Sequence, residues 1–409
     1  MRSIARAWQW MVLVGLVGCA PANDSGSDPA AGAGGSPAPS GRCQAVGDAI
    51  ELPAANTVRV VAQADGYLVL TVSGTQSDSY WISLDGVAGE AVPIGLGRGI
   101  GASAIAGGVL GESAVATTFD GFWKQGGLVF RRYGEGAWED APELASGALP
   151  DVTLATQGAD LATSRSGALA GVWSEGRMDK VGKALIRSAE GTYGAVEDVF
   201  DGYMAEMHGA FDGAENLHVT GPGRSTMDDP LVLRYRARAG DGTWAAPLVL
   251  GPTPGSLQNT IVSGIVATAN GRVFAAETHP ADFATRTDGA TVVYAIDGAE
   301  VSALARLTDP RPVASGLSMA SLGDDGAVIA VAYGQNRLPP GDSEDDVRLY
   351  RCDAAGCALG LMVVEERGTF YGNTAVATQG QRGLVVWSAQ AKLDDEERLG
   401  AQRFDCGGG

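Results

Sequence analysis

The segment Gly240–Leu250, GDGTWAAPLVL, carries the pattern that decides the fold. A strand-like run, LVLRYR from Leu231, leads into its glycine-bearing turn, and a second apolar run follows the turn. The same unit returns as GEGAWEDAPEL at Gly134–Leu144 and as AEGTYGAVEDV at Ala189–Val199. Runs rich in Val, Leu, Tyr and Trp that are bounded by Gly, Asp, Ser and Pro predict strands joined by tight turns.

Fainter copies of this unit begin at Leu84, Ile296 and Ala354, which gives a repeat along the whole chain. Successive turn glycines are 50 to 58 residues apart, and they are Gly86, Gly136, Gly191, Gly242, Gly298 and Gly356. A period of about fifty residues that holds four short strands is typical of one blade of a β-propeller. No long run has the three- and four-residue apolar spacing of a helix. We therefore predict an all-β fold with a single propeller.

A seventh unit begins at Gly372, but it stops after its third strand, LGAQRFDC, because the chain ends at Gly409. The missing outer strand is expected at the other end of the chain, where CQAVGDAIELP begins at Cys43. We therefore expect seven four-stranded blades, the last of which is closed by the amino-terminal strand. Six or eight blades stay open, because the units at Leu84 and Ile296 rest on spacing and strand pattern alone.

Four cysteines remain beside Cys19, and four cysteines allow three pairings. When the end of the chain is followed by its beginning, RFDCGGG and RCQAVGDAIEL parallel the sixth unit, YRCDAAGCALGLMVV. This alignment places Cys406 with Cys352 and Cys43 with Cys357 at equivalent positions. Each pair of positions would link the third and fourth strands of one blade, so we predict the disulfides Cys43–Cys406 and Cys352–Cys357. Four reduced, buried cysteines are the alternative.

The repeat resembles bacterial propeller lipoproteins and the broader group of sialidase-like propellers. Sialidases carry the motif Ser-x-Asp-x-Gly-x-x-Trp at the same turn. Here AGDGTW, at Ala239–Trp244, has the place of that motif but neither its spacing nor its serine. The resemblance therefore implies the fold and no catalytic residue.

The amino-terminal segment has the three zones of an export signal. Arg2 and Arg6 precede an apolar stretch from Ala7 to Leu16, which is too short to span a bilayer. Leu16-Val17-Gly18-Cys19 resembles the lipobox of bacterial lipoproteins, and that resemblance implies cleavage before Cys19 and acylation, such as palmitoylation, of its thiol. In the same family, Ala20 after the cysteine favours the outer over the inner membrane.

These features divide the chain into three parts. Residues 1–18 form the predicted signal peptide, and residues 19–42 form a lipidated linker of Ala, Gly, Ser, Pro, Asn and Asp. Residues 43–409 form the propeller domain. We expect a membrane-anchored protein of the cell envelope. The environment beyond the inner membrane permits disulfides to form.

The charge of the chain excludes one class of partner. The formal net charge is −19, and removal of Arg2 and Arg6 makes it more negative. Nucleic acid is therefore not an expected partner. A protein or a glycan remains open as a partner, beside the membrane that the lipid anchor would contact.

No catalytic pattern emerges from the sequence. The three histidines, His208, His218 and His279, lack the spacing of a metal-binding pair, and we expect them to be structural or exposed. No Gly-x-Ser-x-Gly motif occurs, and the mature cysteines are assigned to disulfides. We therefore assign no catalytic residue.

The remaining pattern in the sequence is a set of loops that are rich in acidic residues. In a propeller, the loops between the second and third strands of all blades emerge on one face. Three of these loops, RSTMDDP, PPGDSEDD and KLDDEER, are rich in carboxylates, and Phe122 and Trp123 occupy the corresponding loop of the second unit. The candidate ligand-binding residues are Phe122, Trp123, Asp228, Asp229, Asp345, Asp346, Asp394 and Asp395. Calcium, which binds six to eight oxygens, is a candidate metal there, and solvated loops are the alternative.

The sequence thus favours a membrane-anchored, non-catalytic binding or scaffold propeller. The alternative is a hydrolase or lyase that acts on glycans through the loop carboxylates on one face. No cofactor other than calcium is expected.

Overall fold

The computed structural model describes residues 42–407 with gaps at 56, 74–75, 96–104, 111, 119–128, 140–142, 145–158, 176–180, 227–228, 230, 251–261, 280–289, 309–313, 334–343, 368–369 and 391–397. The described residues belong to one compact unit, Ser36–Gly409. They form strands and turns without any helix. Among them, no helix of membrane-spanning length and hydropathy occurs.

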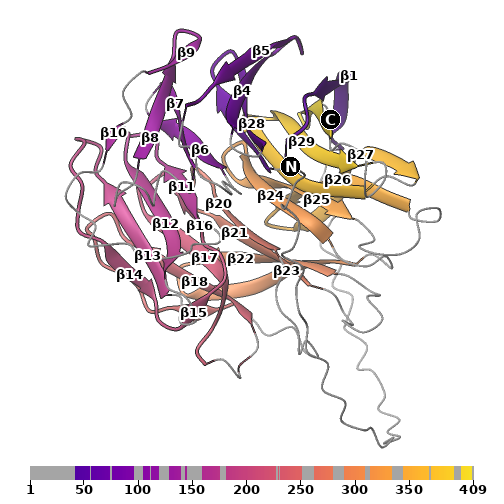
Figure 1. The fold of residues 1–409 in the computed structure, drawn as a ribbon. Coiled ribbons are helices and arrows are strands. Elements are labelled where there is room, and N and C mark those ends of the chain that lie inside the picture. Colours follow the sequence, from indigo (N-terminus) through magenta and orange to yellow (C-terminus); the bar gives the residue numbers. More distant parts are fainter. Residues whose placement is uncertain are drawn as a thin grey trace, which may run out of the picture. The chain divides into compact units, whose positions relative to one another are not determined.

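The sheets of this unit are seven blades in a ring, which confirms the predicted seven-bladed propeller (Figure 1). Blade 1 comprises β2 (Thr57–Gln63), β3 (Gly66–Ser73), β4 (Gln76–Ser83) and β5 (Ala88–Pro93). Blade 2 comprises β6 (Ile105–Leu110), β7 (Ser113–Thr118), β8 (Val129–Gly134), β9 (Ala137–Trp138) and β10 (Glu143–Leu144). Blade 3 comprises β11 (Asp160–Thr163), β12 (Leu169–Glu175), β13 (Val181–Arg187) and β14 (Glu197–Phe200).

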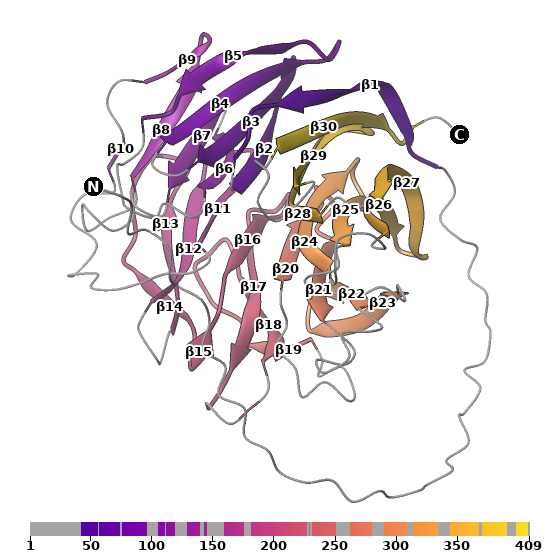
Figure 2. The same ribbon diagram turned by 45° about the vertical axis from the view of Figure 1, so that its right-hand side comes forward.

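The remaining four blades follow in chain order around the ring (Figure 2). Blade 4 comprises β15 (Tyr203–Met204), β16 (His208–Phe211), β17 (Leu217–Arg224), β18 (Val232–Arg238) and β19 (Leu248–Val249). Blade 5 comprises β20 (Val262–Ala267), β21 (Val273–His279), β22 (Ala290–Asp297) and β23 (Glu300–Thr308). Blade 6 comprises β24 (Ala314–Leu322), β25 (Gly326–Tyr333), β26 (Glu344–Asp353) and β27 (Gly356–Arg367). Blade 7 comprises β28 (Phe370–Gln379), β29 (Arg382–Gln390), β30 (Arg398–Asp405) and β1 (Gln44–Leu52).

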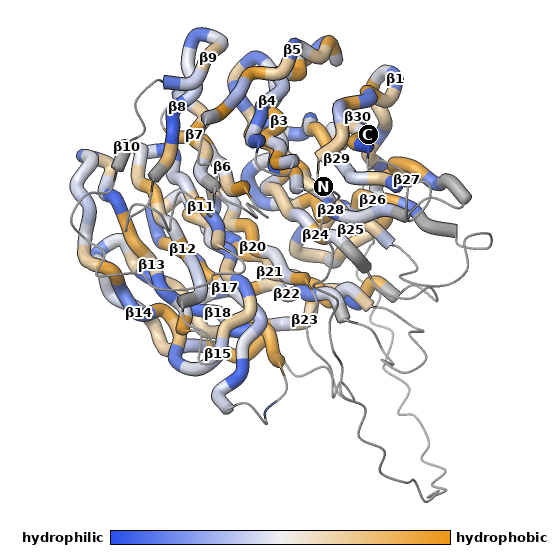
Figure 3. Tube along the Cα trace, in the orientation of Figure 1, coloured by the Kyte–Doolittle hydropathy of each residue, from blue (hydrophilic) through white to orange (hydrophobic). Residues whose placement is uncertain are grey.

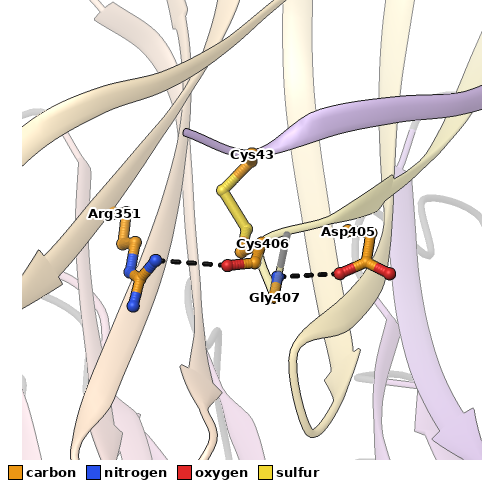
Figure 4. The surroundings of a disulfide bond; sticks show 5 residues. All are labelled: Cys43, Arg351, Asp405, Cys406 and Gly407. Carbon is orange, nitrogen blue, oxygen red and sulfur yellow. Dashed lines mark hydrogen bonds between the residues drawn. A yellow bond between two sulfur atoms is a disulfide. The ribbon is translucent and has the colours of Figure 1, made fainter. Parts of the chain in front are cut away.

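The amino-terminal strand β1 is the outer strand of blade 7, as predicted. It pairs antiparallel with β30, and Gln44 lies opposite Asp405. This register brings Cys43 to Cys406, and the two form a disulfide (Figure 4). Arg351 of blade 6 donates a hydrogen bond to the Cys406 carbonyl at 3.2 Å. The ring is therefore closed both by strand pairing and by a covalent bond.

The second predicted disulfide occupies the equivalent place in blade 6. Cys352 of β26 lies directly opposite Cys357 of β27, and the two are bonded. Gly360, further along β27, leaves room for the neighbouring blade, because a Cβ atom there would lie 2.9 Å from Cys43 Sγ. Both disulfides thus link the third and outer strands of their blades, as the alignment predicted.

The apolar core is divided among the gaps between blades. Seven hydrophobic clusters occur, and each packs residues from two neighbouring blades. The second strands are buried almost throughout, as in β25 and β29, because both of their faces are covered by adjacent blades. Figure 3 shows apolar and polar stretches interspersed in every blade. Each blade therefore depends on both neighbours for its burial.

The turn glycines of the repeat have a shared backbone conformation. All six have positive φ angles, from 60° at Gly298 to 144° at Gly356, and they join the third and outer strands of blades 1 to 6. In three blades the amide of this glycine donates to the carbonyl three residues earlier, as Gly242 does to Ala239 at 2.9 Å. Glycine recurs here because other residues are strained at these angles.

Substitution at one such turn isolates this backbone effect. Gly136 has φ of 82°, whereas Gly134 in the same hairpin does not have a positive φ, and a Cβ at either position meets no atom within 4 Å. We expect Gly136→Ala to lower the free energy of unfolding by about 1 kcal/mol and Gly134→Ala to change it by less than about half of that. Urea denaturation of both variants measures this. Equal losses would contradict the role of the left-handed backbone.

Polar side chains on the hairpins also bind the preceding blade. Trp138 of blade 2 donates its indole N–H to Ser79 Oγ of blade 1 at 2.8 Å. Trp244 of blade 4 donates to Glu197 of blade 3 at 2.6 Å, and Arg238 binds both oxygens of the same carboxylate. The AGDGTW segment thus serves as a contact between blades.

Candidate functional site

The candidate site lies where the innermost strands of the blades meet. These strands are β2, β6, β11, β16, β20, β24 and β28, and each contacts the next around the ring. Tight turns such as those at Gly242 and Gly298 lie on one face, which we call the hairpin face. Because neighbouring strands are antiparallel, the links from one blade to the next lie on the opposite face, which we call the linker face.

A polar cavity of about 180 Å³ is surrounded by these inner strands. Its polar side chains come from five different blades, and they are Arg59, Asp160, His208, Ser263 and Ser318. Asp160 and His208 are the first residues of β11 and β16, and Ser263 is the second residue of β20. These residues therefore lie at the linker-face end of the inner strands.

His208 lies between two carboxylates from different parts of the chain. Its Nδ1 atom is 3.6 Å from Asp160 Oδ2, and its Nε2 atom is 3.4 Å from Glu206 Oε1. The three side chains are 17% to 24% exposed. One imidazole thus links the carboxylates of blade 3 and blade 4.

An interruption of the inner strand of blade 4 positions Glu206. The strands β15 and β16 both pair with β17, and residues 205–207 lie between them. Glu206 Oε1 accepts hydrogen bonds from the Ser263 amide at 2.8 Å and from Ser263 Oγ at 3.0 Å, both on blade 5. Glu206 therefore joins blades 4 and 5 while it faces His208.

Backbone amides hold the carboxylate of Asp160. Its Oδ1 accepts from the Leu161 amide at 2.9 Å, and its Oδ2 accepts from the Gly209 amide at 3.4 Å. Gly209 lies close to blade 3, since a Cβ there would be 3.2 Å from Ala162 Cβ. The small residue allows blades 3 and 4 to approach so that Asp160 can reach His208.

The electrostatics of the cluster favour its ionised form. Burial opposes the charge on His208, but Glu206 and Asp160 outweigh it and raise the pKa of His208 to about 9. Burial likewise opposes ionisation of Asp160 and Glu206, but His208 outweighs it and lowers the pKa of both carboxyls. At neutral pH the cluster is an imidazolium between two carboxylates, so His208 has no lone pair for base catalysis or metal binding.

Removing the imidazole tests this protonation state. The raised pKa of His208 stabilises the fold fully below its unfolded pKa of 6.5, and this stability is lost as pH rises through 9. Wild-type stability should therefore fall by up to about 1.4 kcal/mol per pH unit between pH 7 and 9, and His208→Gln should lack this decline. Urea titrations across this range measure both. Parallel curves would contradict a protonated His208.

Arg59 provides a second positive charge at the cavity wall. It is half-buried, and one Nη atom donates to the neighbouring Val58 carbonyl at 3.1 Å. Its positive charge contributes to the lowered pKa of Asp160. Within the described part of the chain, no carboxylate lies within ion-pair distance of Arg59.

A second polar network in blade 4 is buried and structural. Asp212, at the turn after β16, accepts from the amides of Ala214 and Asn216 at 2.9 Å each. His218 Nε2 is 3.1 Å from Asp212 Oδ2, and its Nδ1 is 2.7 Å from Tyr235 Oη. His218 thus has the structural role that the sequence suggested.

The candidate ligand-binding residues from the acidic loops differ in secondary structure and in exposure. Asp229 is exposed, and its Oδ2 accepts from the Thr226 amide at 2.8 Å. Asp345 and Asp346 lie in strand β26 rather than in a loop, because pairing of Asp346 with Tyr333 extends the β25–β26 hairpin. Asp346 is fully buried and binds Arg348 at 2.8 Å, so it does not face solvent.

The other predicted ligand-binding residues lie outside the described part of the chain, and they are Phe122, Trp123, Asp228, Asp394 and Asp395. Most residues of the three acidic loops, where calcium was the candidate metal, also lie outside it. Within the described residues, no group of three or more His, Cys, Asp or Glu is arranged to hold a metal ion.

A larger cavity, of about 300 Å³, lies at the hairpin face between blades 5 and 6. Its charged lining residues are Arg272, Asp297, Glu300 and Asp325. Asp325 accepts a hydrogen bond from Asn270 at 2.9 Å. This cavity is separate from the inner-strand cavity and is built from exposed turns.

The sequence matches no known protein family and no characterised protein at a significant level. Solved structures, by contrast, match over most of the chain. One is an ulvan lyase of polysaccharide lyase family PL25, with 9% identity and a TM-score of 0.59 over 87% of this chain and 95% of that chain. Another is the BP39L lectin from Burkholderia pseudomallei, with 12% identity and a TM-score of 0.58 over 86% of this chain and 98% of that one.

A third similar structure is the polysaccharide lyase Uly1, with 10% identity and a TM-score of 0.53 over 87% of this chain and 90% of that chain. At identities this low, these structural likenesses show a shared fold alone. The chain is a seven-bladed β-propeller with a polar cavity among its inner strands.

Proposed function

We propose that this protein is a lipid-anchored component of the cell envelope whose propeller binds a glycan without converting it. The observation that carries the proposal is the inner-strand cavity, where Arg59, Asp160, His208 and Ser263 converge. Hydroxyl-rich ligands suit such a wall, because each hydroxyl both donates and accepts hydrogen bonds. Propellers of the same architecture include a lectin and polysaccharide lyases.

The protonation states of the cluster favour binding over catalysis. A glycosidase needs one carboxyl group with a raised pKa to protonate the leaving oxygen. Both carboxyl groups beside His208 have lowered pKa values instead. A lyase needs a base to remove a proton, and a protonated histidine cannot serve. The alternative, a glycan-acting hydrolase or lyase, draws its support from the lyases with the same architecture.

A combined binding and turnover screen tests this proposal. The purified protein is applied to an immobilised glycan array, and each glycan that binds is then incubated with the protein and assayed for new reducing ends and for unsaturated products. We expect binding without product. Asp160→Asn should weaken binding to those glycans, whereas Glu300→Gln, in the hairpin-face cavity, should leave it unchanged. Product that forms with wild type and disappears in Asp160→Asn would instead support the enzyme alternative.

The anchor is proposed from Cys19 and its lipobox-like context. Acyl chains on this residue would hold the protein on the outer membrane with residues 20–42 as a linker. Intact-mass measurement of protein extracted from membranes should show Cys19 as the first residue, with the added mass of its acyl chains. Cys19→Ser should appear in the soluble fraction. An unmodified, soluble wild-type protein would overturn the anchoring.

A further inference from the structure

The charged groups around the inner-strand cavity balance one another. Arg59 and His208 each carry a positive charge at neutral pH, and Asp160 and Glu206 each carry a negative charge. Arg59, Asp160 and His208 line the cavity, and Glu206 lies beside it in contact with His208. Among the described residues, no charged side chain other than those three lines the cavity. The described cluster is therefore electrically neutral as a whole.

Each charge of this cluster lies near a group of the opposite sign. His208 lies between the two carboxylates, and Arg59 is close enough to lower the pKa of Asp160. A carboxylate or sulfate near Arg59 would therefore also be repelled by Asp160, and an ammonium group near Asp160 would be repelled by His208. Because the cavity is partly shielded from water, these interactions are screened less than at an exposed surface.

The hydrogen-bonding groups suit a ligand with several hydroxyls. The guanidinium of Arg59 has five N–H donors, of which the described residues use one. Ser318 Oγ accepts from the Val376 amide at 3.1 Å, so its own proton is free to be donated. Asp160, which also lines the cavity, has carboxylate oxygens that accept hydrogen bonds. Hydroxyls of a sugar can therefore accept from Arg59 and donate to Asp160.

The net negative charge of the whole protein also disfavours anionic ligands. The formal charge of the chain is −19, which repels polyanions at long range. The ulvan lyase of similar architecture was solved with a ligand that contains glucuronate and sulfated rhamnose, both of which are anionic. A shared fold therefore does not require a shared class of glycan.

We infer that the inner-strand cavity selects an uncharged sugar residue over uronates, sulfated sugars and amino sugars. This inference rests on the proposed glycan-binding function and specifies its ligand class. The selectivity comes from the balance of Arg59 and His208 against Asp160 and Glu206. A change of one charge at the cavity should therefore change the preferred class.

The test compares charge variants on an immobilised array with three classes of oligosaccharide: uncharged, uronate- or sulfate-bearing, and amine-bearing. Wild type should bind uncharged glycans. Arg59→Gln leaves the cluster at −1 and should raise the signal on amine-bearing glycans by about tenfold relative to uncharged ones. Asp160→Asn leaves it at +1 and should shift preference by a similar factor toward uronates and sulfates. Glu300→Gln makes the same change in total charge elsewhere and should not shift the preference.

The possible outcomes distinguish failure of this inference from failure of the proposed glycan binding. Wild-type binding confined to charged glycans would overturn the inference and leave glycan binding intact. Absence of binding in all three classes would overturn both. If Asp160→Asn fails to fold by circular dichroism, Arg59→Gln still decides, because Arg59 makes a single hydrogen bond, to its own neighbour Val58, within the described residues. An unchanged preference in Arg59→Gln would also overturn the inference.

Discussion

The double variant Cys43→Ser/Cys406→Ser is expected to lose about 6 kcal/mol of unfolding free energy, the largest effect that we predict. The disulfide joins residues 363 positions apart, and in the chain-entropy model the stabilisation grows with the logarithm of that separation. Strand β1 would then be held in blade 7 by non-covalent contacts, which are its pairing with β30 and the packing of Leu52. Guanidinium denaturation under non-reducing conditions measures the loss.

Blade 6 provides a matched control for this prediction. Cys352 and Cys357 occupy the same strands of their blade but are only five positions apart. The double variant Cys352→Ser/Cys357→Ser should therefore lose roughly 2 kcal/mol in the same model. Similar losses in the two double variants would show that loop closure is not the source of the stability.

Asp212→Ala should be the next most damaging change, with a loss of about 3 kcal/mol. The carboxylate is buried, and it satisfies the amides of Ala214 and Asn216 together with the imidazole of His218. Alanine would leave these groups without an acceptor. Urea denaturation at neutral pH measures the loss, and a change below about 1 kcal/mol would contradict this account.

Asp212→Asn separates the charge from the hydrogen bonds. Burial opposes ionisation of Asp212, but hydrogen bonds from His218 and Asn216 outweigh it and lower its pKa below the usual 3.8. The stability from this shift is present above pH 4 and is lost as pH falls below that value. The gap in stability between wild type and Asp212→Asn should therefore narrow from pH 5 to pH 2. A constant gap would contradict the lowered pKa.

The sequence was sufficient to predict the fold because the repeat is local. Each hairpin needs a left-handed residue at the same place, so Gly136, Gly191 and Gly242 mark successive blades. The cysteines extended this logic to the ring closure, because Cys43 and Cys406 complete a pattern that Cys352 and Cys357 show within one blade. Local pattern and blade geometry were the only information required.

The candidate site was not predicted, because its residues share no local pattern. Arg59, Asp160 and Ser263 belong to three different blades, and they come together only when the inner strands form a ring. Glu206 lies at an interruption between β15 and β16 that no motif marks. His208 looked like an isolated histidine, since both of its partners depend on contacts between strands. The one available signal was an acidic residue near a histidine, Glu206 and His208, and it is common.

Asp346 was predicted to lie in an exposed loop because of the acidic composition around it, and this prediction is wrong. Its neighbours in PPGDSEDD suggested a solvated loop, but the hairpin of blade 6 extends to this residue and Arg348 neutralises it. Runs of carboxylates therefore do not reveal where a strand begins, because a partly buried arginine two residues later can neutralise one of them.

The bond between Cys43 and Cys406 makes the domain topologically circular. A single protease cut in a connection between two blades would leave every blade joined to the rest through the disulfide, so the two fragments would migrate as one molecule until a reductant is added. By the same reasoning, the present ends have no special status in the ring. A permuted gene whose new ends fall in another connection, with Cys43 and Cys406 joined by a short peptide, should encode the same propeller.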